Sequence, residues 1–278
     1  MVVETSRRGL PGAADREGGA PDASSHRSAG ELEQRVAERT AALEAALRVR
    51  DEFLSVASHE LRTPLTSLRL YVDGLVRSAQ LGAVAPADVP RRLARVQDQC
   101  RRLDRLIATL LDVSLLSTQR PVLDLEEVDL GQLVRGTAER MEDDLRRAGC
   151  DLCLRVPLGI VGAWDRTRVE QVFTNLLTNA LRHAAGTPVE VVLSREGSHA
   201  LLQVKDQGPG ISGEDQERLF QRFSRLDSKR PGFGLGLWIS RQLVELHGGG
   251  LTVESAPGQG ACFSVRLPLP AAAPSQGP

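Results

Sequence analysis

The sequence lacks any apolar run approaching the ~20 residues that a helix needs to cross a bilayer. Its polar, arginine-containing N-terminus also lacks the apolar core of a signal peptide. An excess of charge of one sign is missing too, since 35 Lys and Arg stand against 36 Asp and Glu. Such a balance argues against nucleic acid or an anionic membrane surface as a partner. We therefore expect a chain that has no membrane span and binds no nucleic acid.

Cysteine is also scarce. The four cysteines, Cys100, Cys150, Cys153 and Cys262, are too few and too scattered for a disulfide framework, which favours a reducing, cytoplasmic location. Cys150 and Cys153 have the spacing of half a zinc site, but no second pair of Cys or His accompanies them. Ordinary cysteines of a strand are therefore the favoured interpretation, with metal binding as the alternative.

Composition divides the 278 residues, enough for two ordinary domains, into five segments. Gly, Ala, Ser, Arg and Asp dominate the first segment, which has almost no large apolar side chain to bury and is predicted to be disordered. The second segment is rich in Glu, Arg, Ala and Leu, and the last is an Ala/Pro-rich tail. The predicted segments are 1–30 (disordered), 31–51 (coiled-coil helix), 52–120 (helical hairpin), 121–270 (α/β domain) and 271–278 (loose tail).

The coiled-coil segment carries one apolar edge. Leu32, Val36, Leu43, Leu47 and Leu54 recur with the spacing of one side of a long helix. A parallel dimer stalk that transmits rotation or bending is the functional interpretation. A solvated helix with one apolar edge is the alternative.

Two helices follow, the first running to about Ser78 and the second joined to it by residues 82–90, which contain two prolines. In the second helix, apolar residues recur every three or four positions, as in a helix-pairing seam. The seam consists of Leu93, Val96, Cys100, Leu103, Ile107 and Leu110. One hairpin leaves much of such a seam exposed, so two hairpins are expected to pair into a four-helix bundle. The sequence thus predicts a homodimer.

Strands and helices alternate in the rest of the chain, which predicts an α/β sandwich. Asp165 is placed to cap the helix 168–182, and Gly248 to stop the helix that ends at His247. His247 is interpreted as a helix terminus without a partner of its own. The candidate strands are 122–128, 151–156, 189–194, 201–206, 250–254 and 262–267.

The first helix of the hairpin carries a cluster of polar residues at His59, Glu60 and Thr63. His59 and Thr63 are four residues apart, so their side chains share one helix face, and Glu60 lies beside the histidine. Pro64 removes a backbone donor and bends the helix locally. By itself, such a His and Glu pair is more often a solvated pair than a nucleophile and its base. The rest of the chain decides between the two interpretations.

Three motifs in the α/β domain point to a nucleotide. Asn175 and Asn179 share one helix face, and an amide oxygen is a ligand suited to Mg²⁺ already neutralised by phosphates. Asp206 follows a strand and precedes Gly208 and Gly210, which allow close approach of the backbone to a ligand. The third motif opens a helix, where free N–H groups favour phosphate. It contains Gly232, Gly234, Leu235, Gly236 and Leu237.

With these motifs the chain resembles the HisKA-type sensor histidine kinases, whose ATP-binding domain belongs to the GHKL family with gyrase, Hsp90 and MutL. The resemblance covers roughly residues 50–268 and includes a phenylalanine box at residues 219–225. It implies a dimeric antiparallel helical hairpin, a four-helix bundle in the dimer, followed by a Bergerat-type α/β sandwich. It also implies autophosphorylation on His59 with Mg²⁺ and ATP, then transfer to an aspartate of a response regulator.

The resemblance assigns a role to each residue of the histidine cluster. His59 is the phosphoacceptor, Glu60 is the general base, and Thr63 positions the water that dephosphorylates the regulator. Asn179 is the principal Mg²⁺ ligand, and Asn175 is its neighbour at the phosphates.

The same resemblance predicts the residues that contact ATP. Asp206 resembles the acid that accepts a hydrogen bond from the adenine amine, and residues 212–231 resemble a short lid. The other predicted ATP contacts are Arg182, His183, Gly208, Gly210, Phe220, Phe223, Arg225, Lys229, Arg230, Gly232, Gly234, Leu235, Gly236 and Leu237.

Two other functions remain as alternatives. One is a GHKL ATPase of the chaperone or repair type, but those relatives place a water-activating glutamate where this chain has Asn175. The other is a dimeric scaffold that binds ATP and signals by contact without catalysis, an alternative that the short lid keeps open. Because no receiver-like segment or sensor domain is evident, we expect a separate response regulator and a separate sensor protein.

Overall fold

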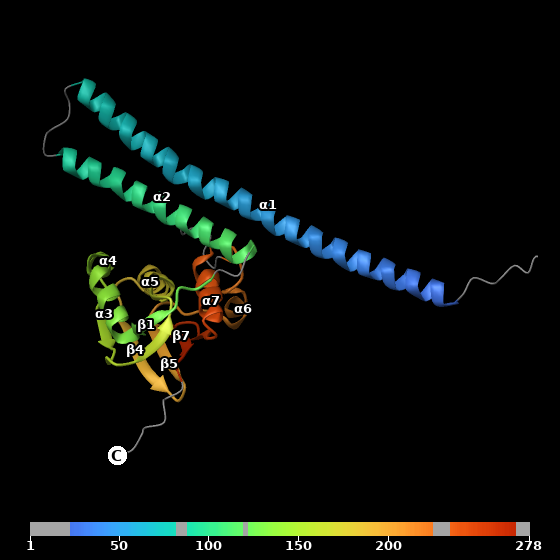
Figure 1. Cartoon of the computed structure of the whole chain (residues 1–278). Coiled ribbons are helices and arrows are strands. Elements are labelled where there is room, and N and C mark those ends of the chain that lie inside the picture. Colours follow the sequence, from blue (N-terminus) through green and yellow to red (C-terminus); the bar gives the residue numbers. More distant parts are fainter. Residues whose placement is uncertain (1–22, 82–87, 119–121, 225–233, 271–278) are drawn as a thin grey trace, which may run out of the picture. The chain divides into compact units, whose positions relative to one another are not determined.

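The computed structural model describes residues 23–81, 88–118, 122–224 and 234–270 (Figure 1). The chain divides into two units, Met1–Ser55 and Val56–Pro278, and helix α1 (Ala23–Gln80) crosses the boundary. None of the described helices is long and apolar enough to cross a membrane.

Helix α1 begins inside the segment 1–30 whose composition predicts disorder. Propagating an existing helix costs much less than nucleating one, and the long helix that follows extends into this Ala- and Ser-containing stretch. In the first unit the apolar edge of α1 is exposed in the single chain. Val36 is 58% exposed and Leu43 is 63% exposed.

Two helices form the predicted hairpin. The first is the C-terminal part of α1, and the second is α2 (Val89–Thr118). Most of the predicted connection lies at residues 82–87, outside the described residues. Residues of the predicted seam remain accessible in the single chain, where Leu93 is 48% and Ile107 is 44% exposed, whereas Leu106 and Val113 are buried. The seam therefore leaves apolar surface exposed in the single chain.

Two β-sheets follow the hairpin. The small one pairs β1 (Glu126–Asp129) with β3 (Val161–Trp164) in antiparallel fashion. The large one has five strands in the order β2-β4-β5-β7-β6, with β2 parallel to β4 and the other pairs antiparallel. Its strands are β2 (Leu152–Arg155), β4 (Val189–Glu196), β5 (His199–Asp206), β6 (Gly250–Ser255) and β7 (Ala261–Pro268).

All six predicted strands have a counterpart, but the strand predicted at 122–128 begins only at Glu126, and β3 is a strand that the sequence did not predict. Strand β3 has only four residues, and two of them, Gly162 and Ala163, are small. Its sequence therefore shows too little alternation of apolar and polar residues to predict a strand. Tertiary structure supplies the reason for this strand. Trp164 is fully buried, and its indole Nε1 donates to the carbonyl of Pro268 at 3.1 Å, at the end of β7.

The helices of this α/β domain pack against the large sheet. Helix α5 contacts α3 on one side and α7 on the other, and both α5 and α7 contact strands of the sheet. The core between the layers contains Phe173, Leu176, Leu202, Ile239 and Phe263, each almost completely buried. The helices are α3 (Leu130–Arg140), α4 (Glu142–Ala148), α5 (Arg166–His183), α6 (Gly213–Arg218) and α7 (Gly236–Leu246).

Both predicted helix termini are confirmed. Asp165 is the N-cap of α5, and its side chain accepts a hydrogen bond from the backbone N–H of Arg168. Helix α7 has His247 as its C-cap, and Gly248 follows with φ of 74°, the left-handed conformation that glycine adopts at low cost.

Candidate functional site

The histidine cluster lies on the exposed surface of α1. The His59 side chain is 78% exposed, whereas that of Glu60 is only 12% exposed. The ring nitrogen Nδ1 of His59 lies 3.8 Å from Oε1 of Glu60, within ion-pair range but longer than a hydrogen bond. Since Glu60 lies beside Nδ1, the other ring nitrogen, Nε2, is the one available to a reactant from solvent.

Thr63 is also exposed, but its hydroxyl is engaged. Its Oγ1 donates to the backbone carbonyl of His59 at 3.2 Å. This is a local bond of the kind that threonine makes to the preceding helical turn. Pro64, the next residue, stays inside the helix and removes one backbone donor there. The cluster is thus placed at a local interruption of the helix bonding pattern.

The two asparagines of α5 differ in their surroundings. Asn175 Nδ2 lies 3.4 Å from the carbonyl of Gly236 and 3.3 Å from the Ser240 hydroxyl, both on α7, and donates to each. Asn179, one turn later, is partly exposed. The amide of Asn175 therefore fixes the start of α7 against α5, whereas the side chain of Asn179 is partly open to solvent.

Asp206 ends strand β5 and organises the loop that follows. Its Oδ1 accepts from the backbone N–H of Gly208 at 2.9 Å and from that of Ala261 at 3.3 Å. Among the described residues, nothing donates to its Oδ2. One oxygen holds the loop while the other is left to accept a hydrogen bond from a ligand, as expected of an adenine-reading acid.

Close backbone contacts explain the glycines of this loop. Gly210 has φ of 72°, and a Cβ at this position would lie 1.9 Å from the carbonyl oxygen of Ala256. Gly260 has the same φ, and its Cβ would lie 2.0 Å from the carbonyl oxygen of Asp206. A Cβ on Gly208 would lie 3.0 Å from the carbonyl oxygen of His183. The fold itself therefore requires glycine at 210 and 260.

Gly210→Ala is expected to destabilise the α/β domain by about 3 kcal/mol or more, since a methyl group cannot fit against a backbone carbonyl at positive φ. Gly213→Ala is the matched control, because a Cβ there meets nothing within 4 Å. Urea unfolding of the full chain measures both. Equal stability of the Gly210 variant and the wild type would contradict the packing described above.

The phenylalanine box contacts the first turns of α7. The Arg222 guanidinium lies 4.4 Å from the ring centroid of Trp238, and that of Arg241 lies 5.5 Å from the ring of Phe220. Partial burial lowers the pKa of Arg222. Phe223 has φ of 61°, unusual for a residue with a side chain. Phe220 is thus engaged with α7.

Several predicted ATP contacts lie outside the described residues, namely Arg225, Lys229, Arg230 and Gly232. The structure does place the others. Gly234, with φ of 65°, approaches the backbone of Ser224 so closely that a Cβ would lie 2.3 Å from its carbonyl oxygen. Leu235 is buried, and Leu237 is partly exposed in the first turn of α7.

Charged residues of α2 act on residues near both ends of α5. Asp112, only 8% exposed, accepts from Arg168 Nη1 at 2.6 Å and from Gln171 Nε2 at 2.5 Å. At the other end, desolvation and the nearby charges of Arg105 and Arg102 lower the pKa of Arg182. Positive charge therefore gathers where the phosphates are predicted to bind. The sequence analysis missed Asp112, because a lone acid in an apolar helix pattern gives no signal of a partner far along the chain.

Other predicted site residues are placed as follows. His183 is exposed in the last turn of α5, next to Arg182. The contacts that the structure shows for His59 are to Glu60 and Thr63 of its own helix. Among the described residues, no three His, Cys, Asp or Glu side chains are grouped so that they could hold a metal ion. An Mg²⁺ site here would consequently depend on amide oxygens and on the phosphates of a ligand.

Two family models match the chain. Residues 49–119 match the His Kinase A (phospho-acceptor) domain, and residues 164–271 match the histidine kinase-, DNA gyrase B- and HSP90-like ATPase family. Together they cover more than half of the chain.

Curated and solved proteins agree with these matches. The chain is 37% identical over 225 residues to the alginate biosynthesis sensor protein KinB of Pseudomonas aeruginosa. This alignment covers 80% of the chain and 37% of KinB. The chain thus spans less than two fifths of the length of this relative. A solved structure of the histidine kinase AdeS of Acinetobacter baumannii is 26% identical with a TM-score of 0.59, and the match covers 77% of this chain and 98% of the solved chain.

A third similar structure is the histidine kinase ThkA in complex with the response regulator protein TrrA. It is 25% identical, with a TM-score of 0.56, covering 86% of this chain and 65% of that one. The hairpin with an exposed histidine, the α/β domain with its glycine-lined Asp206 loop, and both family matches lead to one assignment. The chain belongs to the HisKA-type sensor histidine kinases.

Proposed function

We propose that this chain uses ATP to phosphorylate itself on His59 and passes the phosphoryl group to an aspartate of a response regulator. The observation that carries the proposal is the environment of His59. Its ring is 78% exposed, and Nδ1 lies beside the largely buried Glu60. This orientation leaves Nε2 accessible, and a neutral imidazole is a competent nucleophile at neutral pH.

In the proposed reaction, the lone pair of His59 Nε2 attacks the γ-phosphorus of ATP and the bond from phosphorus to the β,γ-bridging oxygen breaks, releasing ADP. As positive charge develops on the ring, the carboxylate of Glu60 moves from 3.8 Å into hydrogen-bond range of Nδ1. There it accepts the hydrogen bond or the proton of Nδ1. Apo distances of this length commonly shorten in the reacting complex. Positioning of the two reactants supplies most of the barrier reduction.

Nucleotide binding is assigned to the α/β domain. Asp206 would accept from the adenine amine through Oδ2, and Gly208 and Gly210 let the base approach the backbone. Asn179, which is partly exposed on α5, would hold Mg²⁺ together with the phosphates, and Asn175 would lie beside it. When bound, Mg²⁺ supplies charge neutralisation at the transferred phosphoryl group. Arg182 adds positive charge near the same place.

The residue at 175 favours kinase activity over ATP hydrolysis. Its amide donates to Gly236 and Ser240 and has no basic group that could activate water. A hydrolytic ATPase of the chaperone or repair type would need such a base here. Phosphate transfer to a nucleophile from another domain is the chemistry that this arrangement leaves open.

We also propose the partners. Exposed apolar residues on both helices of the hairpin, among them Leu65, Leu70, Ile107 and Leu111, support a homodimer with a four-helix bundle. The structure of ThkA with TrrA supports a response regulator as the acceptor. We keep the division into a helix-hairpin domain at 52–120 and an ATP-binding domain at 121–270, a cytoplasmic location, and a separate sensor protein as parts of the proposal.

Single-turnover incubation of the purified full chain with γ-³²P-labelled ATP and Mg²⁺ tests the proposal. An acid-labile, alkali-stable phosphoprotein is expected. Release of free phosphate without phosphoprotein would favour the ATPase alternative, and neither product would favour the scaffold that binds ATP without catalysis.

Thr63→Ala is expected to leave autophosphorylation within about twofold while slowing dephosphorylation of the receiver by ~10-fold or more, because the hydroxyl that orients water is lost. The assay follows loss of label from a purified receiver domain that this chain has phosphorylated. Thr66→Ala, an exposed threonine in the next turn, is the control. Equal dephosphorylation rates for the Thr63 variant and the wild type would exclude Thr63 from this step.

A further inference from the structure

His247 has two partners that its sequence context did not reveal. Its imidazole is buried at 8% exposure, at the C-cap of α7. Nδ1 lies 2.7 Å from the carbonyl oxygen of Leu243, and Nε2 lies 3.0 Å from the backbone nitrogen of Asp165. The ring therefore joins the C-terminal end of α7 to the N-terminal end of α5.

These two bonds fix the protonation state of the ring. The backbone nitrogen of Asp165 can only donate, so Nε2 must be the acceptor and carries no proton. The carbonyl of Leu243 can only accept, so Nδ1 must carry the proton. His247 is thus a neutral imidazole with its proton on Nδ1, and it cannot exchange the roles of its nitrogens without losing both bonds.

The first turn of α5 explains why an outside acceptor is needed. A capping box would place Glu or Gln three residues after the N-cap, where its side chain would accept from the N-cap N–H. Here that position is Arg168, which has donors only. Asp165 itself uses Oδ1 for the N–H of Arg168 and Oδ2 for the N–H of Asp124. Nε2 of His247 supplies from α7 the acceptor that α5 lacks.

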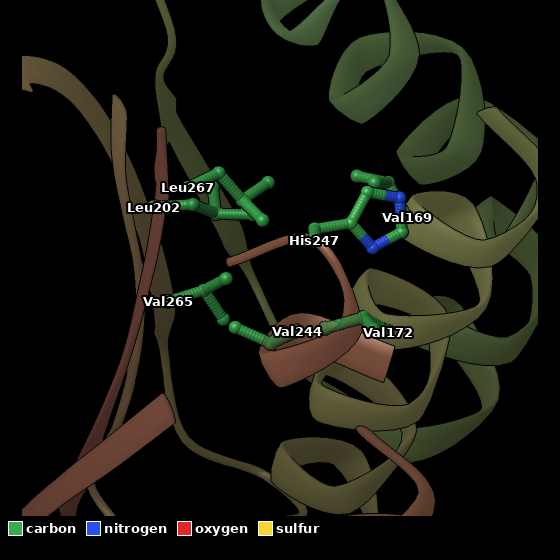
Figure 2. Close-up of a pocket in the computed structure, with 7 residues that line it drawn as sticks. All are labelled: Val169, Val172, Leu202, Val244, His247, Val265 and Leu267. Carbon is green, nitrogen blue, oxygen red and sulfur yellow. The ribbon is translucent and has the colours of Figure 1, made fainter. Parts of the chain in front are cut away.

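The other end of the same helix pair lies at the predicted phosphate site. Asn175, in the middle of α5, donates to Gly236 and Ser240 of α7, so the helices run antiparallel and α7 is bonded to α5 at both of its ends. Between these ends the contact is apolar. Figure 2 shows the His247 ring and side chains of both helices on one side of a small cavity, and sheet residues on the other. The cavity lining is Val169, Val172, Leu202, Val244, His247, Val265 and Leu267.

Apolar side chains pack without a preferred direction. Their contact therefore constrains the distance between α5 and α7 more strongly than a shift of one helix along the other. The cavity of about 10 Å³ has room for at most about one water, and among its lining side chains only His247 is polar. Gly249 anchors the turn after His247, because a Cβ there would lie 2.1 Å from the carbonyl of Arg266 in β7. Among the described residues of α5, α7 and their caps, the bond from Asp165 to His247 is consequently the hydrogen bond that joins the two helices at this end.

We infer that His247 is a positioning residue of the nucleotide site. By bonding Asp165 it holds the far end of α7 in the lengthwise alignment that the Asn175 bonds set at the near end, and so supports the placement of Asn175 and Asn179 relative to the glycines at the start of α7. The inference rests on the ATP site proposed above. His247 itself touches no part of that site and acts through the two helices.

Two substitutions of similar polarity separate this role from simple packing. In His247→Gln, the side-chain oxygen reaches the position of Nε2 and still accepts from Asp165. In His247→Asn, the shorter amide reaches only the position of Nδ1, so it bonds Leu243 and leaves the N–H of Asp165 without an acceptor. We expect His247→Asn to bind a non-hydrolysable ATP analogue about tenfold more weakly than wild type. We expect His247→Gln to stay within about threefold of it.

Calorimetric titration of the full chain measures these affinities, at a temperature where the melting curve shows every variant folded. His199→Asn, a histidine at the start of β5, is the control. Wild-type affinity in both His247 variants, with lower melting temperatures alone, would overturn the inference. Weaker binding by the Gln variant than by the Asn variant would also overturn it.

Nitrogen NMR gives a readout independent of nucleotide. In ¹⁵N-labelled wild type, the His247 ring, assigned by its absence in His247→Gln, is expected to show a protonated Nδ1 and an unprotonated Nε2. A proton on Nε2 would overturn the inference whether or not ATP binds. If the wild type binds no ATP analogue while the tautomer is as expected, the proposed nucleotide site fails and the bond between the helices stands.

Discussion

Replacing His59 by glutamine is expected to abolish acid-labile phosphorylation, with a loss of ~10³-fold or more. Glutamine has nearly the same length, but the lone pair of its amide nitrogen is delocalised and cannot attack phosphorus. The His59 side chain is 78% exposed and, within the part of the chain that the structure describes, bonds no other element, so the change should cost the fold almost nothing. The measurement is the incorporation of label from γ-³²P-ATP into the full chain.

The control for His59→Gln is nucleotide affinity, which should equal that of the wild type because the proposed ATP site lies in the α/β domain. His199→Gln controls for loss of a histidine as such. Retained labelling in His59→Gln would mean that another residue is the phosphoacceptor. Glu60→Gln should give an intermediate result, because the acceptor next to Nδ1 keeps its shape and loses its charge.

Asp206→Asn should weaken ATP binding by about 100-fold, which corresponds to ~2.7 kcal/mol. The asparagine Oδ1 can keep the two bonds to Gly208 and Ala261, so the loop is retained. Only the second oxygen changes, from an acceptor into an NH₂ donor that faces the donor of the adenine amine. A site built to accept one hydrogen bond discriminates strongly against such a mismatch.

Guanine has a carbonyl oxygen where adenine has its amine, so the ratio of ATP affinity to GTP affinity should fall in the Asp206 variant. Titration of the full chain with non-hydrolysable ATP and GTP analogues measures both affinities. Asp151→Asn, an exposed acid just before β2, is the control with the same loss of charge. An unchanged affinity for ATP in Asp206→Asn would remove this residue from the adenine site.

Local pattern was sufficient for much of this fold. The apolar spacing predicted both hairpin helices, which extend to Gln80 and Thr118. The sequence also predicted that Asp165 caps α5 and that Gly248 ends α7, because helix caps depend on residues within one helical turn. By contrast, β3 and the start of α1 at Ala23 depended on neighbours in space or on propagation of a long helix.

The candidate site shows the same division. Asp206, Gly210 and the two asparagines stood out as a motif series, yet the sequence could not show that Gly210 lies against the carbonyl of Ala256. It also interpreted His247 as a helix terminus only. The partner of that ring, Asp165, lies more than eighty positions away and is bonded through its backbone, which leaves no mark in side-chain pattern.

The sequence by itself determined which residues could do chemistry, since a nucleophilic ring, an acid and amides are properties of residue types. It also determined helices and strands whose side chains repeat with a fixed period. Only the tertiary structure decided the order of the sheet, which Asp206 oxygen remains available, and how α5 is aligned on α7. Those features arise from packing and hydrogen bonds between segments far apart in the chain, and no local period encodes them.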